Sequence, residues 1–317
     1  MAKYLTKRVL QSFITILLII CIVFLLLRLM PADYFFTEQE LMKLTKEQRM
    51  DRLQAEGLLD PPLVQLGRFL GGLARGDFGV SRRLQAGQPV VEVISEKFMV
   101  SIQLGAISFA LSLVLGIVIG ILQARFKDRL LDNIGMGFTV LVQAVPHLVL
   151  YSLILVFGSR LFGLPSMYST RKVFMSSILP VVCLSVGSIA SYMLWTRRYM
   201  VDELNKDYIR LAKLKGLSTR TIMFRHVLRN AMVPLVQYMP YSFLMTIGGS
   251  LLAERFFSVP GMGPLLTDSI SRYDVNVVQA LVILYAVMGI LGLLLGDLLM
   301  TAIDPRIRIS GKGGTTR

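Results

Sequence analysis

Six apolar runs, each about as long as a membrane is thick, are separated by polar segments along this chain. They cover residues 9–30, 99–122, 134–157, 174–195, 231–252 and 277–303. A helix that crosses the hydrocarbon core of a bilayer needs about 20 mostly apolar residues. Run 231–252 contains Pro234 and Pro240, which membrane helices tolerate because neighbouring groups satisfy the freed backbone. The pattern predicts an all-α integral membrane protein with six transmembrane helices.

The first run could be a signal peptide or a membrane helix, and a long polar segment follows it. The run exceeds the apolar core of a signal peptide, about 7–15 residues, so we expect a retained helix whose Arg28 reaches the far interface. Segment 31–98 predicts a small extracytoplasmic subdomain between helices 1 and 2. Within it, residues 45–58 should be helical and stop before Pro61-Pro62. Turns are expected at Gly71-Gly72 and at Gly76-Asp77-Phe78-Gly79.

The distribution of basic residues predicts how the helices are oriented. The 317 residues include 34 Lys and Arg against 20 Asp and Glu, a formal net charge of +14. In a soluble protein this excess would suggest nucleic acid, but Lys and Arg also gather in the cytoplasmic loops of membrane proteins. Here the excess falls before the first run, between the second and third, between the fourth and fifth, and after the last. We therefore expect both termini in the cytoplasm, the subdomain outside and no nucleic-acid partner.

Residues suited to catalysis or metal binding are sparse. Cys21 and Cys183 lie within apolar runs, and His147 and His226 are far apart, which excludes a disulfide framework and a histidine-rich metal motif. The nucleotide-binding pattern G-x-x-x-x-G-K-[ST] does not occur. We predict a chain that is not an enzyme and has no metal or cofactor of its own.

Small residues in the apolar runs predict where helices touch. Gly116-x-x-x-Gly120 and Gly292-x-x-x-Gly296 would let helix backbones approach closely in lipid. Asp297, near the cytoplasmic end of the last run, is expected to be structural rather than substrate-binding.

The most informative segment, 202–234, is strongly basic yet has a helical pattern. A first helix is predicted, with one face formed by Leu204, Tyr208, Leu211, Ala212 and Leu214. Gly216 ends it, and Ser218 caps a second helix. These features predict a helix–glycine–helix elbow on the cytoplasmic face. From charge and periodicity alone, an amphipathic helix lying on anionic lipid is an alternative.

Several sequence motifs extend this interpretation. D-Y-x-R-x-A-x-x-K-G occurs at 207–216 and R-H-x-L-R-N-A-x-x-P at 225–234. These segments resemble the cytoplasmic loop of ABC-importer permeases of the dipeptide, oligopeptide and nickel branch. The general motif of such permeases, E-A-A-x-x-x-G-x9-I-x-L-P, is matched only by Ala212, Gly216 and Leu228. Further segments similar to that branch are G-D-F-G-V-S at 76–81, G-Q-P-V at 87–90, E-R-F-F-S-V-P-G-M-G at 254–263 and D-P-R-I-R at 304–308.

The resemblance implies a type I ABC importer permease fold and the role of the first of two permeases in a bacterial or archaeal inner membrane. Its implied partners are a second homologous permease, two ATP-binding subunits that bind ATP and Mg, and an extracytoplasmic substrate-binding protein. The residues implied to couple to the ATPase are Asp207, Tyr208, Arg210, Ala212, Lys215, Gly216 and Leu217. Gly216 would supply the turn and Ala212 a close approach. Arg210 and Lys215 would pair with acidic residues of the ATPase or remain solvated.

The expected organisation follows from the runs and the motifs. Residues 1–30 hold the cytoplasmic N-terminus and first helix, and residues 31–98 the subdomain. Residues 99–303 form a five-helix permease core that contains the coupling loop 196–230, and residues 304–317 form a cytoplasmic tail.

Polar residues within the runs are candidates for lining a substrate path, because polar groups in membranes usually face the bundle interior. They are Gln103, Gln143, His147, Tyr192, Gln237, Tyr238 and Tyr241. The branch implies di- and oligopeptides as substrates, with nickel or another small solute as the alternative. An ion-driven secondary transporter would need acidic residues near the midplane or repeated halves, and a membrane enzyme would need paired catalytic groups. We find neither pattern.

Overall fold

The computed structural model describes residues 2–29, 31 and 35–303, and every regular element in these residues is a helix. The elements before the long second span are α1 (Ala2–Arg28), α2 (Glu38–Lys43), α3 (Lys46–Ala55) and α4 (Pro62–Leu73). The middle of the chain forms α5 (Val90–Arg125), α6 (Leu130–Ala144), α7 (His147–Phe162), α8 (Val173–Leu204) and α9 (Asp207–Leu214). The remainder forms α10 (Thr219–Thr221), the π-helical turn η2 (Ile222–Val227), α11 (Leu228–Ile247), α12 (Leu251–Phe256), α13 (Met262–Ser271) and α14 (Val275–Ile303). The predicted tail 304–317, with its D-P-R-I-R motif, lies outside the described residues.

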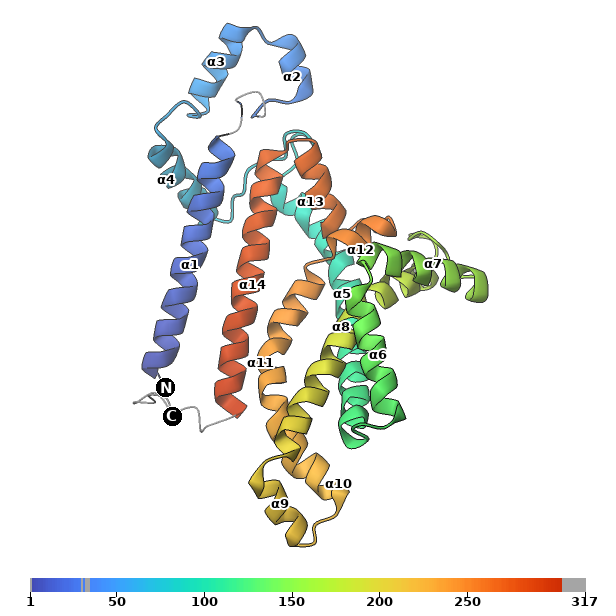
Figure 1. Cartoon of the computed structure of the whole chain (residues 1–317). Coiled ribbons are helices and arrows are strands. Elements are labelled where there is room, and N and C mark those ends of the chain that lie inside the picture. Colours follow the sequence, from blue (N-terminus) through green and yellow to red (C-terminus); the bar gives the residue numbers. More distant parts are fainter. Residues whose placement is uncertain (1, 30, 32–34, 304–317) are drawn as a thin grey trace.

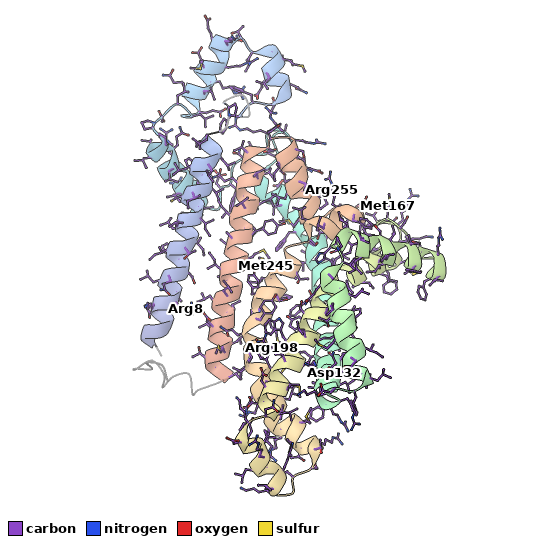
Figure 2. The ribbon with its side chains drawn as sticks, in the orientation of Figure 1. Arg8, Asp132, Met167, Arg198, Met245 and Arg255 are labelled. Atoms are coloured by element: carbon purple, nitrogen blue, oxygen red, sulfur yellow. The ribbon has the colours of Figure 1, made fainter. Side chains whose placement is uncertain are left out.

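The helices form a bundle with a small helical cap at each end. Figure 1 shows α2 and α3 at one end, and α9 and α10 at the opposite end. The labelled Arg8 on α1, Asp132 on α6 and Arg198 on α8 all lie toward the end that carries α9 and α10 (Figure 2). The elbow and the subdomain are therefore on opposite sides of the bundle, as the predicted topology requires.

Among the described residues, four helices are long and apolar enough to cross a membrane, and they are α1, α5, α8 and α14. Helices α6 and α7 together would form a fifth span. Helix α11 has 20 residues and keeps Pro234 and Pro240 inside it. The six predicted runs correspond in order to α1, α5, the α6–α7 pair, α8, α11 and α14. Length and hydropathy support four or five of them as spans in the described residues, and α11, which ends at Ile247 inside the run 231–252, is not one of these.

The predicted run 134–157 is not one continuous helix, and this expectation was wrong. The axes of α6 and α7 are bent by 115° at a short break. Pro146 explains the break, because a proline disfavours the helical conformation in the residue before it. Val145 is accordingly extended, with φ −81° and ψ 130°. As a result α7 projects sideways from the bundle (Figure 1).

Helices α5 and α8 pack through a stripe of small residues. A Cβ added to Gly116 would lie 2.4 Å from Tyr192 Cβ, and one added to Gly120 would lie 2.6 Å from Thr196 Cβ. Nothing larger than glycine fits at this spacing, so the first predicted glycine pair is a real helix contact. One turn toward the subdomain, the Ser112 hydroxyl donates to its own helix at Ser108 O (2.7 Å) and across to Ser185 O (3.2 Å).

The second glycine pair brings α14 against α11. A Cβ added to Gly292 would lie 2.6 Å from Tyr241 Cα, and one added to Gly296 would lie 2.0 Å from Gln237 O. Beside this contact, Asp297 Oδ1 accepts from Gln237 Nε2 (3.0 Å), and Asp297 Oδ2 lies 3.3 Å from Arg8 Nε. Asp297 thus joins α1, α11 and α14, in agreement with the structural role expected for it.

A buried carboxylate helps to anchor the subdomain to the bundle. Asp274, which precedes α14, is fully buried, and its Oδ2 accepts from Ser81 Oγ at 2.6 Å. The same oxygen accepts the backbone N–H groups of Arg82 (3.1 Å), Arg83 (2.9 Å) and Leu84 (2.9 Å). Three successive amides around one anion form a backbone nest. The turn at 80–84 is therefore fixed on the start of α14.

The subdomain confirms one predicted turn and corrects another. Gly76 and Gly79 have positive φ, as the turn requires. Gly71-Gly72 was expected to form a turn but lies inside α4. Helix α4 is held by tertiary packing, because Phe69 stacks on Phe24 of α1 with ring centroids 5.3 Å apart. Such packing can outweigh the roughly 1 kcal/mol that a glycine costs in a helix.

Candidate functional site

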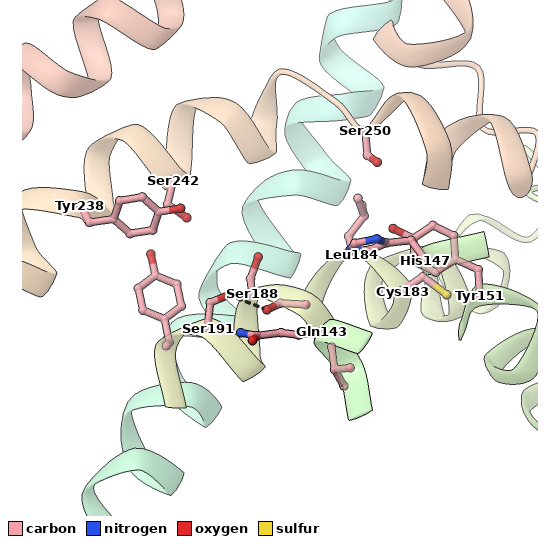
Figure 3. Close-up of a pocket in the computed structure, with 13 residues that line it drawn as sticks. Gln143, His147, Tyr151, Cys183, Leu184, Ser188, Ser191, Tyr238, Ser242 and Ser250 are labelled. Atoms are coloured by element: carbon pink, nitrogen blue, oxygen red, sulfur yellow. Dashed lines mark hydrogen bonds between the residues drawn. The ribbon is translucent and has the colours of Figure 1, made fainter. Parts of the chain in front are cut away.

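A cavity of about 400 Å³ opens between α6, α7, α8 and α11 (Figure 3). The break at Pro146 places the end of α6 and the start of α7 on the same side of this cavity. Its polar lining consists of Gln143, His147, Tyr151, Ser188, Ser191, Tyr192, Tyr238, Ser242 and Ser250. Among the described lining residues none is Asp, Glu, Lys or Arg. The wall therefore offers hydrogen bonds and aromatic surface without a fixed charge.

Four of the seven predicted path residues meet at this cavity: Gln143, His147, Tyr192 and Tyr238. They come from the α6–α7 break, α8 and α11. The Tyr192 and Tyr238 rings approach each other with centroids 6.3 Å apart. These two rings therefore form an aromatic corner where α8 and α11 face each other.

The other three predicted path residues do not line this cavity. Gln237 is bonded to Asp297 of α14. Tyr241 packs its backbone against Gly292 and its ring 5.9 Å from that of Tyr238. Gln103 is exposed on α5. The helical pattern alone could not separate the face of α11 that packs on α14 from the face that lines the cavity.

Two further cavities continue the first one along α8 and α11. One, of about 280 Å³, shares Ser191, Tyr192 and Tyr238 with the first cavity. The next, of about 550 Å³, shares Tyr199 and Pro234 with the second. Together the three make a groove, here called the α8–α11 groove, that runs from Ser250 to the elbow.

The elbow has the geometry that the sequence predicts. Gly216 has φ +76°, and an added Cβ would meet nothing within 4 Å, so glycine is required there by backbone conformation rather than by space. Ser218 Oγ accepts from Thr221 N, which confirms the predicted N-cap. The second helix then continues through η2 into α11, so the elbow joins the groove helix directly.

The faces of α9 differ from the expectation. Ile209 and Ala212 are buried against η2, Met200 and Ala124, so the close approach at Ala212 is made by elements of this chain. Leu211 and Leu214 were expected on the same face, but they are 54% and 85% exposed. The exposed apolar side chains of α9 and the turn after it are Tyr208, Leu211, Leu214 and Leu217. This set is called the α9 face below.

The charged coupling candidates surround the α9 face in solvent. Arg210 Nη1 lies 3.3 Å from Asp207 Oδ1, and both side chains are largely exposed. Lys215 is exposed at the C-terminal end of α9. An exposed pair of this kind contributes about 0–1 kcal/mol to stability. These charges are therefore free to interact with a partner surface.

Glu203, at the end of α8, holds the elbow together and was not among the predicted site residues. It is 7% exposed, and its Oε1 accepts from Tyr208 Oη and from Asn230 Nδ2 (3.0 Å). Its Oε2 lies 2.6 Å from Lys206 Nζ. One carboxylate thereby connects the ends of α8, α9 and α11. Little in the sequence indicated this role for Glu203, because an acidic residue among basic ones is typical of a solvated loop.

The environment of Tyr208 keeps its hydroxyl a donor. Burial, followed by the nearby Glu203 carboxylate, raises the pKa of Tyr208 to about 12. Asn230 Nδ2 also donates to Tyr208 Oη at 2.9 Å. The Tyr208 hydroxyl therefore stays protonated at neutral pH, where it can donate to Glu203.

The chain is similar to a known family of transport proteins and to several of its members. The sequence model of the family described as "Binding-protein-dependent transport system inner membrane component" matches residues 116–309. The chain is 35% identical to the dipeptide transport system permease protein DppB of Lactococcus lactis subsp. cremoris over 312 residues, which cover 98% of this chain and 100% of that one. It is 33% identical to the oligopeptide transport system permease protein OppB of Salmonella typhimurium over 310 residues, 97% of this chain and 100% of that one.

A solved structure shares the fold. It is described as "Inward facing conformations of the MetNI methionine ABC transporter", and it matches with a TM-score of 0.53 at 15% identity. The match covers 68% of this chain and 97% of that chain. At this identity the likeness shows a common fold, that of a type I ABC importer permease.

Proposed function

This chain belongs to the family of binding-protein-dependent transport system inner membrane components, and on that premise we propose that it is a permease subunit of an ATP-driven importer of dipeptides and oligopeptides. Relatives that match over nearly the whole chain carry those substrate names. Nickel or another small solute is the alternative substrate.

The observation that carries the proposal is the direct connection between the α8–α11 groove and the elbow. Helix α8 lines the first cavity at Tyr192 and reaches Glu203, 11 residues later, where it is bonded to α9. At 1.5 Å per residue the two points are about 16 Å apart along one helix. A displacement of α9 would therefore be transmitted to the groove without an intervening flexible joint.

The groove suits a substrate whose side chains vary. A peptide presents backbone N–H and C=O groups in every sequence, and the hydroxyl, amide and imidazole groups of the first cavity can bond them. Fixed charges would favour some side chains and reject others. The wall of the first cavity carries none among its described residues, which supports a tolerant path there.

We assign the energy source to partner chains. The α9 face would dock in a groove of an ATP-binding subunit, with Arg210 and Lys215 placed to meet acidic residues there. ATP and Mg would be bound by two such subunits, and a second homologous permease would complete the pore. An extracytoplasmic binding protein would deliver substrate on the side of α2–α4, and both termini would lie in the cytoplasm of a cell whose inner membrane holds the complex.

A transport assay tests the proposal. The chain is co-expressed with a second permease, two ATPase subunits and a binding protein, and the complex is purified and reconstituted in proteoliposomes. Uptake of a labelled dipeptide should require ATP and all subunits, and a Leu214→Asp variant, which places a charge on the α9 face, should lose uptake. The matched variant Leu161→Asp changes a similarly exposed leucine on α7. Uptake without ATPase subunits, or uptake of nickel but no peptide, would contradict the peptide-importer assignment.

A further inference from the structure

A separate cavity of about 250 Å³ lies away from the α8–α11 groove, beside the end of α1 that meets the subdomain. It is bordered by α1, residues 56–58 after α3, α4, the turn at 76–79 and the start of α14. Its charged and amide lining is Arg28, Glu56, Gln65, Arg68, Asn276 and Gln279, together with Asp77. None of these residues has a role in the transport path proposed above.

Arg28 is positioned in this cavity by aromatic rings rather than by an acid. Its guanidinium carbon lies 4.8 Å from the centroid of Phe24 and 4.9 Å from that of Phe35. Its Nη1 atom is buried and makes no hydrogen bond within the described residues. Rings over a guanidinium leave its in-plane N–H groups available. A partly buried cation with an unused donor that solvent does not reach is costly unless an anion or a strong acceptor completes it.

Two buried glutamines add unpaired groups to the same wall. Gln279 of α14 is 6% exposed, and its Nε2 has no partner in the described chain. Gln65 of α4 is 8% exposed and donates to Leu58 O (2.8 Å) and Asp60 O (2.7 Å), which leaves its Oε1 unpaired. The cavity therefore presents two donors, on Arg28 and Gln279, and one acceptor, on Gln65.

The acids at this cavity are already engaged elsewhere. Glu56 Oε2 lies 2.7 Å from Arg82 Nη2, and Asp77 Oδ1 accepts from Gly79 N at 2.8 Å. Arg68 is bound to Asp60 at 2.6 Å and remains 60% exposed at the rim. No carboxylate among the described residues forms an ion pair with Arg28, so within that part of the chain its guanidinium has no counterion.

We propose that this cavity binds a phosphate-type anion, and its depth assigns the headgroup of an anionic phospholipid as the source. Arg28 ends a membrane-spanning helix, so its guanidinium lies at the level of lipid phosphates. Below it, Leu18, Ile22 and Leu25 leave apolar surface on α1 exposed for acyl chains. The phosphate would accept from Arg28 and Gln279, and a headgroup hydroxyl such as that of glycerol would donate to Gln65.

Native mass spectrometry of the full chain in detergent tests this site. The probes are phosphatidylglycerol, phosphatidylcholine with the same acyl chains, and inorganic phosphate alone. Phosphatidylglycerol should bind more tightly than phosphatidylcholine, and Arg28→Gln should weaken it about tenfold or more, the value of a charge-assisted hydrogen bond. Arg28→Lys should restore part of the affinity. Arg75→Gln, which removes an exposed charge on the same side, should leave it unchanged.

A second variant distinguishes a loss of lipid binding from a loss of folding. Gln279→Met keeps the size of a side chain whose Nε2 has no protein partner, so it should fold normally yet weaken phosphatidylglycerol severalfold. Saturable binding of inorganic phosphate that depends on Arg28 would support the anion site and identify a free anion as occupant. Equal binding of both lipids, or unchanged phosphatidylglycerol affinity in both Arg28→Gln and Gln279→Met, would overturn the proposal.

Discussion

Replacing Glu203 should release the elbow from the groove helices while leaving the bundle intact. Glu203→Ala removes the acceptor shared by Tyr208 and Asn230 and the ion pair with Lys206. The carboxylate is at the end of α8, outside the α5–α8 contact, so insertion and helix packing should persist. The specific effect is expected on α9, whose remaining attachment is the burial of Ile209 and Ala212.

The size of the effect follows from the three groups that contact the Glu203 carboxylate. A hydrogen bond to a charged group contributes about 1.5–3 kcal/mol, and the lower end applies to Tyr208 because that residue is 38% exposed. The exposed Lys206 adds about 0–1 kcal/mol. Together the three partners stabilise the docked α9 by roughly 3 kcal/mol, which corresponds to about a hundredfold in its opening equilibrium. Tyr208→Phe, which removes only one donor, should account for about tenfold.

Hydrogen exchange of the reconstituted complex measures this opening. Amides of Asp207–Leu214 should exchange about a hundredfold faster in Glu203→Ala and about tenfold faster in Tyr208→Phe, because local opening sets the exchange rate. The double variant should match Glu203→Ala alone, since both changes act on one network. Peptide uptake should fall in the same order. Asp202→Ala, an exposed acid one residue earlier, is the matched control. Wild-type exchange over α9 in Glu203→Ala would refute the reasoning.

Three further changes test other parts of the structure. Gly216→Val places a branched residue at positive φ and should destabilise the elbow turn by about 1–2 kcal/mol, with uptake reduced and membrane insertion unchanged, whereas Gly216→Asn should be milder. Gly120→Leu should lower the yield of folded chain on size exclusion because α8 lies in contact, while Gly137→Leu, in open space, should not. Asp274→Asn weakens four hydrogen bonds, so a protease should cleave the 80–84 turn severalfold faster; an unchanged cleavage rate would show that other contacts hold the subdomain.

The long elements and the elbow were predictable because their signals are local. A run of apolar residues, a glycine at positive φ and a serine cap are each contained within a few residues. The glycine pairs were also predictable, since small residues at a spacing of four mark one face of one helix. In each case the sequence states the requirement without reference to a distant partner.

The remaining features depend on contacts between distant segments. Glu203 is important because Asn230, 27 residues later, returns to it. Asp274 binds amides about 190 residues earlier. Gly71-Gly72 alone predicts a turn, whereas the stacking of Phe69 on Phe24 of α1 explains why this segment is helical. The break at Pro146 was the exception, because its cause is local and the long apolar run concealed it.

Ser108 and Ser112 of α5, whose hydroxyls also donate to α8, have a consequence for membrane insertion. Helix α5 ends at Arg125 and its partner α8 begins at Val173, 48 residues later (173 minus 125). At about 5–20 residues per second of synthesis, α5 waits several seconds in the membrane before α8 exists. During that interval Ser108 and Ser112 can donate to Leu104 O (2.8 Å) and Ser108 O (2.7 Å) of their own helix. The nascent chain can therefore release α5 into lipid alone and recruit α8 afterwards, so insertion and assembly are separable steps.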